Sequence, residues 1–256
     1  MRAFLQPHRI IMMLIALGLV GMILVNGNWS WLPKYSPMIL QGIWRTIWLL
    51  VLSIAIGFSL AVPLGLAQAS GPWYLAAPAR VFCTVIRGTP LLLQIWLLYY
   101  GLGSLFPSIP WIRESELWPL LRQAWPYALV ALSLSYAGYE GEVMRGAFAS
   151  VPRGQIAAAR AMGMPRRKIF SRISLPQAVQ SVLPTLGGEA VLQLKATPLV
   201  ATITVVEIYA VTSRVRQDTL IVYEPLFLVA AIYLALAALI VLGFRQIGGK
   251  GMRKPA

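Results

Sequence analysis

Residues Ser150 to Gln177 read SVPRGQIAAARAMGMPRRKIFSRISLPQ, a basic and polar stretch between two long apolar segments. No Asp or Glu occurs from Val143 to Gly188, whereas seven Lys and Arg residues fall in that interval. Basic residues concentrated between apolar segments are typical of a loop on the cytoplasmic side of a membrane. This stretch therefore predicts a membrane protein organised around a cytoplasmic loop.

The loop itself is predicted to contain two short helices. Residues 155–162 are rich in Ala, the strongest helix former, and Gly163 ends that run. Pro165 follows and opens a second helix over residues 166–174. Leu175 and Pro176 are predicted to close this second helix and to lead into the next apolar segment.

The composition supports a membrane protein. The chain has 256 residues, of which 58% are hydrophobic and 12% charged, and its mean hydropathy is +0.71. Soluble domains are nearer a quarter charged, and a helix needs about 20 apolar residues to span a bilayer. We predict an all-α polytopic membrane protein with one membrane domain. The net charge of +14 is then attributed to Lys and Arg in inner loops, so no nucleic-acid partner is expected.

Metal sites and the common catalytic pairs are excluded by the residue inventory. Cys83 is the only cysteine and His8 the only histidine, so neither a Cys/His metal cluster nor a Ser-His or Cys-His pair within the fold can form. The G-x-x-x-x-G-K-[ST] pattern of ATP-binding loops is also missing. The sequence therefore predicts neither a catalytic residue nor a metal site in this chain.

Six transmembrane helices are predicted. The first, residues 10–25, resembles a signal-peptide core in length, but no A-x-A-like cleavage site follows it, so we predict a retained helix. This gives an extra N-terminal helix with a periplasmic linker (1–36), a five-helix membrane domain (37–247) and a basic cytoplasmic tail (248–256). The six segments are Ile10–Val25, Ile39–Ala67, Arg80–Leu105, Ala124–Met144, Gln177–Glu207 and Pro225–Phe244.

Charge asymmetry sets the orientation. Fourteen Lys and Arg residues fall in the predicted inner loops and tail, against five in the predicted outer loops. Both termini are therefore expected in the cytoplasm. If the first segment were cleaved, five helices would remain with the same orientation.

Several residues within the spans are candidates for packing or for a substrate pathway. Small residues of the second segment, Ser53, Gly57 and Ser59, suit close helix packing. The fifth segment carries Glu189, Lys195 and Thr197, and it is predicted to be interrupted at Pro184, Gly187, Gly188 and Pro198. A broken helix with ionisable residues is typical of a substrate pathway.

Glu189 has two open interpretations. Its carboxylate either faces a cavity and receives a cationic group, or forms an internal pair with Lys195 or Arg87. Glu140 and Glu142 lie two positions apart and point in different directions on a helix. One is predicted to face the pathway and the other to lie near Arg145.

The central loop resembles the EAA loop of ABC import permeases. The EAA pattern continues with three residues, Gly, nine residues and Ile-x-Leu-Pro. Ala158 and Ala159 take the alanine places, Gly163 the glycine place, and Ile173, Leu175 and Pro176 the final places. Ala157 stands where the pattern has its acid.

Three further stretches extend the resemblance from Gln41 to Phe244: RGTPLLLQIWLLYYGLG from Arg87, YEGEVMRGAFASVPRGQ from Tyr139, and GGEAVLQLKATPLVATITVVEI from Gly187. They are similar to the polar amino-acid uptake group of ABC permeases, close to its histidine/arginine and opine branch. The resemblance implies inward transport by alternating access, with cationic amino acids or opines as first choice and other polar amino acids open. The residues predicted to line the substrate pathway are Glu189, Glu140, Lys195, Thr197, Arg87 and Thr89, although Arg87 alternatively only anchors its helix at the inner interface.

The resemblance also implies partners in a bacterial inner membrane. The loop would be the coupling helix that contacts a dimer of ATP-binding subunits, which would bind ATP and Mg²⁺, while this chain binds no cofactor directly. A periplasmic solute-binding protein would deliver the solute. A second permease subunit is expected: a different chain is favoured because Ala157 lacks the acid, and a homodimer is the alternative. The predicted contact residues are Gln155, Ala157, Ala158, Ala159, Arg160, Gly163, Ile173, Leu175 and Pro176.

Three other functional classes are alternatives. A passive channel would leave the loop spacing unexplained. An intramembrane enzyme would have little chemistry available beyond buried glutamates. A membrane scaffold would make those glutamates structural.

Overall fold

The structure is a computed structural model that describes residues 18, 21–23 and 25–251 of the chain. Every regular element in these residues is a helix or a helical turn, which confirms the all-α prediction. Most of the predicted first span, Ile10–Val25, and the end of the basic tail, residues 252–256, lie outside the described residues. The division into 1–36, 37–247 and 248–256 therefore stays a prediction.

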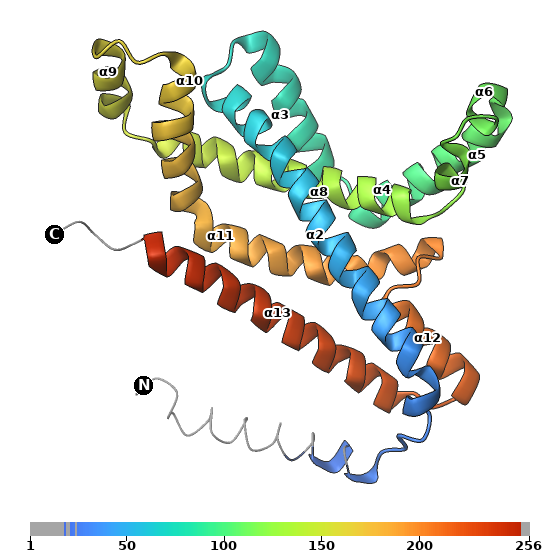
Figure 1. The fold of residues 1–256 in the computed structure, drawn as a ribbon. Helices are drawn as coiled ribbons and strands as arrows, with labels where there is room; N and C mark the ends of the chain where they lie inside the picture. The colour runs from blue at the N-terminus through green and yellow to red at the C-terminus, as the bar shows by residue number, and fades with distance from the viewer. Residues whose placement is uncertain (1–17, 19–20, 24, 252–256) are drawn as a thin grey trace.

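Six longer helices build the molecule (Figure 1). They are α2 (Leu32–Ser70), α3 (Trp73–Gly88), α8 (Trp125–Ser150), α11 (Leu175–Ala196), α12 (Ile208–Thr219) and α13 (Tyr223–Gly251). The shorter helices are α4 (Leu91–Trp96), α5 (Gly103–Leu105), α6 (Pro110–Arg113), α7 (Trp118–Leu121), α9 (Arg153–Ala161) and α10 (Arg166–Ile169). The π-helical turns η2 (Leu97–Leu102) and η4 (Phe170–Ser174) and the 3-10 helices η3 (Phe106–Ser108) and η5 (Thr197–Ile203) connect them.

In the described part of the chain, three helical stretches are long and apolar enough to cross a membrane: Leu32–Ser70, Leu91–Ser108 and Tyr223–Ile247. A fourth is added if Arg166–Ile203 and Ile208–Thr219, which meet at a bend of 52°, form one broken span. α8 has 26 residues, about 39 Å at 1.5 Å per residue, but Glu140, Glu142 and Arg145 make it more polar. The count of six spans stays a prediction.

Two intervals between the predicted spans are largely helical. Between Ala67 and Arg80 only Gly71 and Pro72 lie outside the helices, because Pro72 is extended and directly precedes α3. Between Glu207 and Pro225 the chain forms α12, whose first turn is capped by the side chain of Glu207. The outer position of this interval stays a prediction.

The predicted interruptions of the fifth span were wrong in part. α11 is continuous through Pro184, Gly187 and Gly188, and the geometry changes only at Thr197, where the chain tightens into η5. Membrane helices tolerate such residues because neighbouring groups satisfy the freed backbone. Gly187 instead permits close packing, since a Cβ there would lie 3.1 Å from Cβ of Phe244 in α13.

Within the described residues, α2 and α8 share the most extensive helix–helix contact. Ser53, Gly57, Ala61 and Gly65 repeat every four residues along one face of α2, and all four are buried. A Cβ at Gly57 would lie 2.8 Å from the carbonyl oxygen of Ser133, so no larger residue fits at this crossing. The predicted small-residue face is therefore correct for Ser53 and Gly57 but wrong for Ser59, which is exposed. Small residues at every fourth position let two membrane helices approach each other closely.

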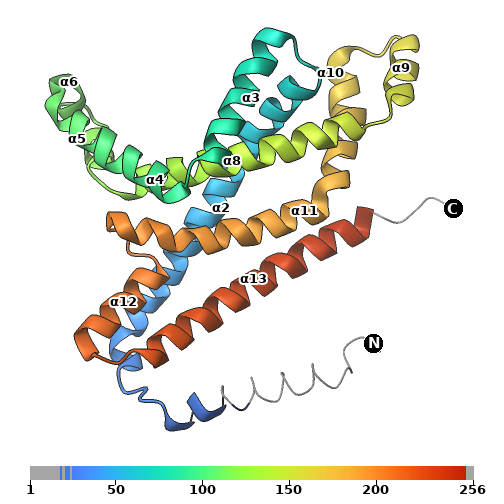
Figure 2. The ribbon, with the colours of Figure 1, turned by 180° about the vertical axis from the view of Figure 1, so that it is seen from behind.

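Different helices lie at the two ends of the bundle (Figures 1 and 2). α9, α10 and the C-terminal end of α13 lie at one end, and α6, α7 and α12 lie at the other. Between them, three buried clusters follow α2: Ile208 and Val211 of α12 pack near its start, Leu132 of α8 near its middle, and Met144 of α8 near its end. α2 therefore links the two ends of the molecule through continuous packing.

Candidate functional site

The RGTP stretch is a break between two helices. α3 ends at Gly88, Thr89 and Pro90 are extended, and α4 begins at Leu91. Gln94 satisfies the backbone at the break, because its Nε2 atom donates to the carbonyl oxygens of Ile86 at 2.9 Å and Thr89 at 3.1 Å, and to Oγ1 of Thr89 at 2.9 Å. Gln94 was not among the predicted residues, although an amide four residues after a helix-breaking proline is a recognisable signal.

Arg87 lies just before this break and is exposed. Its guanidinium carbon lies 5.8 Å from the centre of the Tyr139 ring on α8, within range of a cation–π contact. Arg87 is also within electrostatic range of Glu189. The arginine is therefore held near α8 and α11.

Glu140 is the most unusual polar residue in the described part of the chain. It lies in α8, its exposed fraction is 0%, and neither carboxyl oxygen has a hydrogen-bond partner. A buried carboxyl without a partner is costly. Glu189 of α11 is close enough to interact electrostatically with it. The structure thus brings two of the predicted pathway residues together from separate helices.

Glu189 itself is partly exposed. Only two ion pairs within 4.0 Å occur among the described residues, and neither involves Glu189, Lys195 or Arg87. Lys195 is exposed and lies on the same helix. The described structure therefore contains no close ion pair of the kind considered as the alternative for Glu189.

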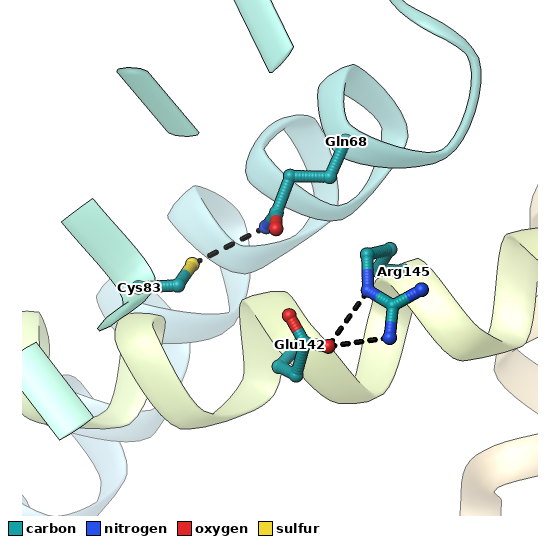
Figure 3. A network of polar contacts seen from close by, with 4 residues as sticks. All are labelled: Gln68, Cys83, Glu142 and Arg145. Carbon is teal, nitrogen blue, oxygen red and sulfur yellow. Dashed lines mark hydrogen bonds and ion pairs between the residues drawn. The ribbon is translucent and has the colours of Figure 1, made fainter. Parts of the chain in front are cut away.

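Glu142 is paired, as expected for one of the two glutamates. Its Oε1 atom accepts a hydrogen bond from Nε of Arg145 at 2.7 Å, and Figure 3 shows this pair one turn apart on α8. Beside it, Nε2 of Gln68 contacts Sγ of the buried Cys83 at 3.3 Å. Among the described residues, Glu142 therefore has an ion-pair partner, whereas the carboxyl of Glu140 has none.

Thr197 is buried within a hydrogen-bond network. It is fully buried, its Oγ1 atom donates to the carbonyl oxygen of Leu194 at 2.9 Å, and it lies 3.1 Å from the hydroxyl of Tyr233. That hydroxyl donates to Glu207 at 3.0 Å. Glu207 in turn accepts from the backbone N–H groups of Tyr209 at 2.9 Å and Ala210 at 2.8 Å.

This network joins η5, α12 and α13 through one buried carboxylate. Glu207 was predicted only as the last residue of the fifth span. Its position before Ile208 and a more polar helix was the available signal, because an acidic side chain can cap a helix N-terminus and complement its dipole.

The basic loop contains α9, an exposed helix with a defined end. α9 covers Arg153–Ala161 and ends at Gly163 with φ of 74°. The N–H of Gly163 bonds to the carbonyl of Arg160 at 2.9 Å, and the N–H of Met164 bonds to that of Ala159 at 3.0 Å. These two bonds form a Schellman motif. The glycine of the EAA-like spacing therefore supplies a left-handed residue that other side chains adopt at a cost.

α9 exposes most of its surface. Gln155, Ala157, Ala158 and Arg160 are exposed, while Ala159 is buried. Gln155 accepts a hydrogen bond from Nε2 of Gln177 on α11 at 2.7 Å. This bond connects the exposed helix to the helix that carries Glu189.

The last part of the loop departs from the predicted helix end. Residues Arg166 to Ala196 are helical throughout, with the π-helical turn η4 between α10 and α11. Ile173 lies in η4, and Leu175 and Pro176 begin α11. Pro176 does not stop the helix, because the wider π turn before it accommodates the carbonyl that the proline leaves free.

Comparison with known proteins identifies the arrangement. Residues 61–254 match the family described as binding-protein-dependent transport system inner membrane component. The chain belongs to this family. It is a membrane permease component, and the passive channel, intramembrane enzyme and scaffold interpretations are set aside.

Curated relatives and a solved structure agree with this assignment. The octopine transport system permease protein OccM of Rhizobium meliloti is 45% identical over 198 residues, covering 77% of this chain and 79% of OccM. The histidine/lysine/arginine/ornithine transport system permease protein HisM of Escherichia coli K12 is 32% identical over 206 residues, covering 80% and 85%. A crystal structure of an amino acid ABC transporter with histidines superposes with a TM-score of 0.71 at 26% identity, covering 87% of this chain and 98% of that one.

Proposed function

We propose that this permease component imports cationic amino acids or opine-type amino-acid derivatives, and that Glu140 and Glu189 contact the cationic group of the solute. The relatives named for octopine and for histidine, lysine, arginine and ornithine support this solute class. The observation that carries the proposal is the unpartnered, fully buried carboxyl of Glu140.

The acid pair favours a cation for an electrostatic reason. Two carboxyls close together inside a membrane protein repel each other when both are ionised, and each loses its hydration. A guanidinium or ammonium group placed between them offsets both costs. A neutral or acidic solute offers no such compensation.

Permeases of this family work with ATP-binding subunits and other permease subunits. For this chain we propose that the exposed face of α9, including Ala157 and Ala158, contacts an ATP-binding subunit that binds ATP and Mg²⁺. The hydrogen bond between Gln155 and Gln177 supports transmission to α11. In our proposal a periplasmic solute-binding protein delivers the solute, a different permease chain completes the membrane part, and both termini are cytoplasmic.

Uptake by the reconstituted complex tests the solute and the acid pair. Wild-type proteoliposomes should accumulate labelled L-arginine with ATP and the binding protein. Glu140→Gln and Glu189→Gln should each reduce uptake at least about tenfold, the effect of roughly 1.4 kcal/mol. Glu116→Gln is the matched control, because Glu116 is exposed and distant in the chain. Assembled Glu140→Gln and Glu189→Gln complexes with unchanged arginine uptake would refute the role of the acid pair.

A further inference from the structure

A cavity lies away from Glu140 and Glu189, at the end of the bundle that holds α7 and the start of α8. Its volume is about 490 Å³, and its walls come from α2, η2, α8 and the turn after η5. Two arginines, Arg45 and Arg122, line it together with the aromatic side chains of Trp48, Tyr99 and Trp125. This end lies opposite α9, so in the proposed orientation the cavity opens on the outer side.

The aromatic walls are held by specific contacts. The rings of Trp48 and Trp125 pack edge to face, with centroids 5.3 Å apart and planes at 84°. Nε1 of Trp125 donates to Oε1 of Gln123 at 2.8 Å. Such contacts fix the shape of the aromatic wall, while Arg45 and Arg122 stay exposed and accessible from the outer side.

Arg45 is positioned by the backbone. Its Nη1 atom donates to the carbonyl oxygen of Val206 at 3.3 Å. The chain reaches that carbonyl through Thr204, which adopts a left-handed conformation with φ of 67°. One hydrogen bond leaves most of the five guanidinium donors available.

The positive charges of the cavity are uncompensated. Neither Arg45 nor Arg122 belongs to an ion pair within 4.0 Å among the described residues, and no Asp or Glu lines the cavity. Planar guanidinium groups bind carboxylates through two parallel hydrogen bonds. An aromatic-walled cavity with two free guanidinium groups therefore suits an organic anion.

We propose that this cavity is an outer capture site that binds the carboxylate end of the transported solute. The inference rests on the proposed function and extends it, because it assigns opposite ends of the solute to opposite charges. Arg45 and Arg122 receive the carboxylate, and Glu140 and Glu189 receive the cationic end further along the path. An opine with two carboxylates would use both arginines, so this site favours opines over simple amino acids.

Uptake with a fixed binding protein isolates the contribution of the cavity. The same binding protein serves every variant, so a change in uptake relative to wild type belongs to the permease. Arg45→Gln with Arg122→Gln should lower octopine uptake at least about tenfold and L-arginine uptake less, because charge-assisted hydrogen bonds are the stronger kind. Arg45→Lys should retain part of the uptake, and Arg113→Gln, an exposed arginine outside the cavity, should change neither.

Protection of an introduced cysteine reports occupancy directly. Val206→Cys places a thiol on the exposed part of the lining and keeps the backbone carbonyl that Arg45 contacts, while native Cys83 is buried. In nanodiscs of phosphatidylcholine alone, octopine should slow maleimide labelling of this variant severalfold, L-arginine less, and L-argininamide, which lacks the carboxylate, not at all. Ser104→Cys, exposed and outside the cavity, should be labelled at the same rate with and without solute.

The outcomes separate this proposal from the proposed function. If the double variant takes up octopine as fast as wild type, or if octopine does not slow the labelling, the capture site is overturned and the proposed function remains intact. If the wild-type complex takes up neither arginine nor octopine, the proposed function is overturned. Protection by added phosphatidylglycerol but not by octopine would assign the arginines to a lipid phosphate and overturn the capture site.

Discussion

Replacing Gly65 by alanine should separate α2 from α8. A Cβ at this position would lie 2.6 Å from Cβ of Met144 and 2.8 Å from the backbone nitrogen of Arg145. Ordinary contacts of this kind are nearer 3.5 Å, and the exposed fraction of Met144 is 0%, so the backbones must move apart. Overpacking of this kind costs about 1–3 kcal/mol.

Helix propensity opposes this cost. Exchanging Gly for Ala inside a helix contributes about 0.8–1.0 kcal/mol, so the net destabilisation is roughly 0–2 kcal/mol. At about 2–4 °C per kcal/mol for a chain of this size, the apparent melting temperature should fall by up to about 8 °C. The measurement is fluorescence-detected size exclusion of the detergent-solubilised complex after heating at a series of temperatures.

Gly146→Ala in α8 is the matched control. A Cβ there would meet nothing within 4 Å, so only the propensity gain should remain and the melting temperature should hold or rise. If Gly65→Ala matched or exceeded the stability of Gly146→Ala, the close approach of α2 and α8 at Gly65 would be wrong.

Three further changes probe the loop and the buried network. Gly163→Ala should weaken the end of α9 by about 1–2 kcal/mol, the cost of a left-handed residue with a Cβ, and reduce solute-stimulated ATPase activity. Gly163→Asn should retain more, and equal activity of both would contradict the Schellman end. Ala157→Glu should raise ATPase activity severalfold if this chain couples weakly for want of an acid, whereas an unchanged rate would support an asymmetric pair of permeases. Tyr233→Phe removes the hydroxyl that donates to Glu207, and should cost about 1.5–3 kcal/mol as a hydrogen bond to a charged group, seen as a lower melting temperature. Tyr223→Phe, which alters an exposed ring, should be silent, and equal losses from both would remove the case for the network.

Features that depend on neighbouring residues in the chain were predictable from the sequence. Gly163 ends α9 because a left-handed residue is needed there, and that requirement is visible in the spacing of the loop. The long apolar runs predicted α2, α8 and α13 for a similar reason: apolar length and periodicity are properties of one segment at a time.

Features that depend on a distant partner were missed. α12 is mixed in charge, and its start is secured by Glu207 together with Tyr233, which lies 26 residues further along. Gly187 resembled a helix break, yet it makes room for Phe244 of α13. The proximity of Glu140 to Glu189 likewise depends on how α8 meets α11. Spacing within one segment carries no information about such contacts.

The continuity of Arg166 to Ile203 changes how the loop should act. A break at Leu175 and Pro176 would have let α10 move without moving the membrane segment. The structure instead runs from α10 through η4 into α11 without leaving helical geometry. A displacement of α9 reaches the same helix by a second route, through the hydrogen bond between Gln155 and Gln177. Two connections from the exposed loop therefore meet on α11, the helix that carries Glu189. A displacement of α9 would thus move Glu189 relative to Glu140 on α8.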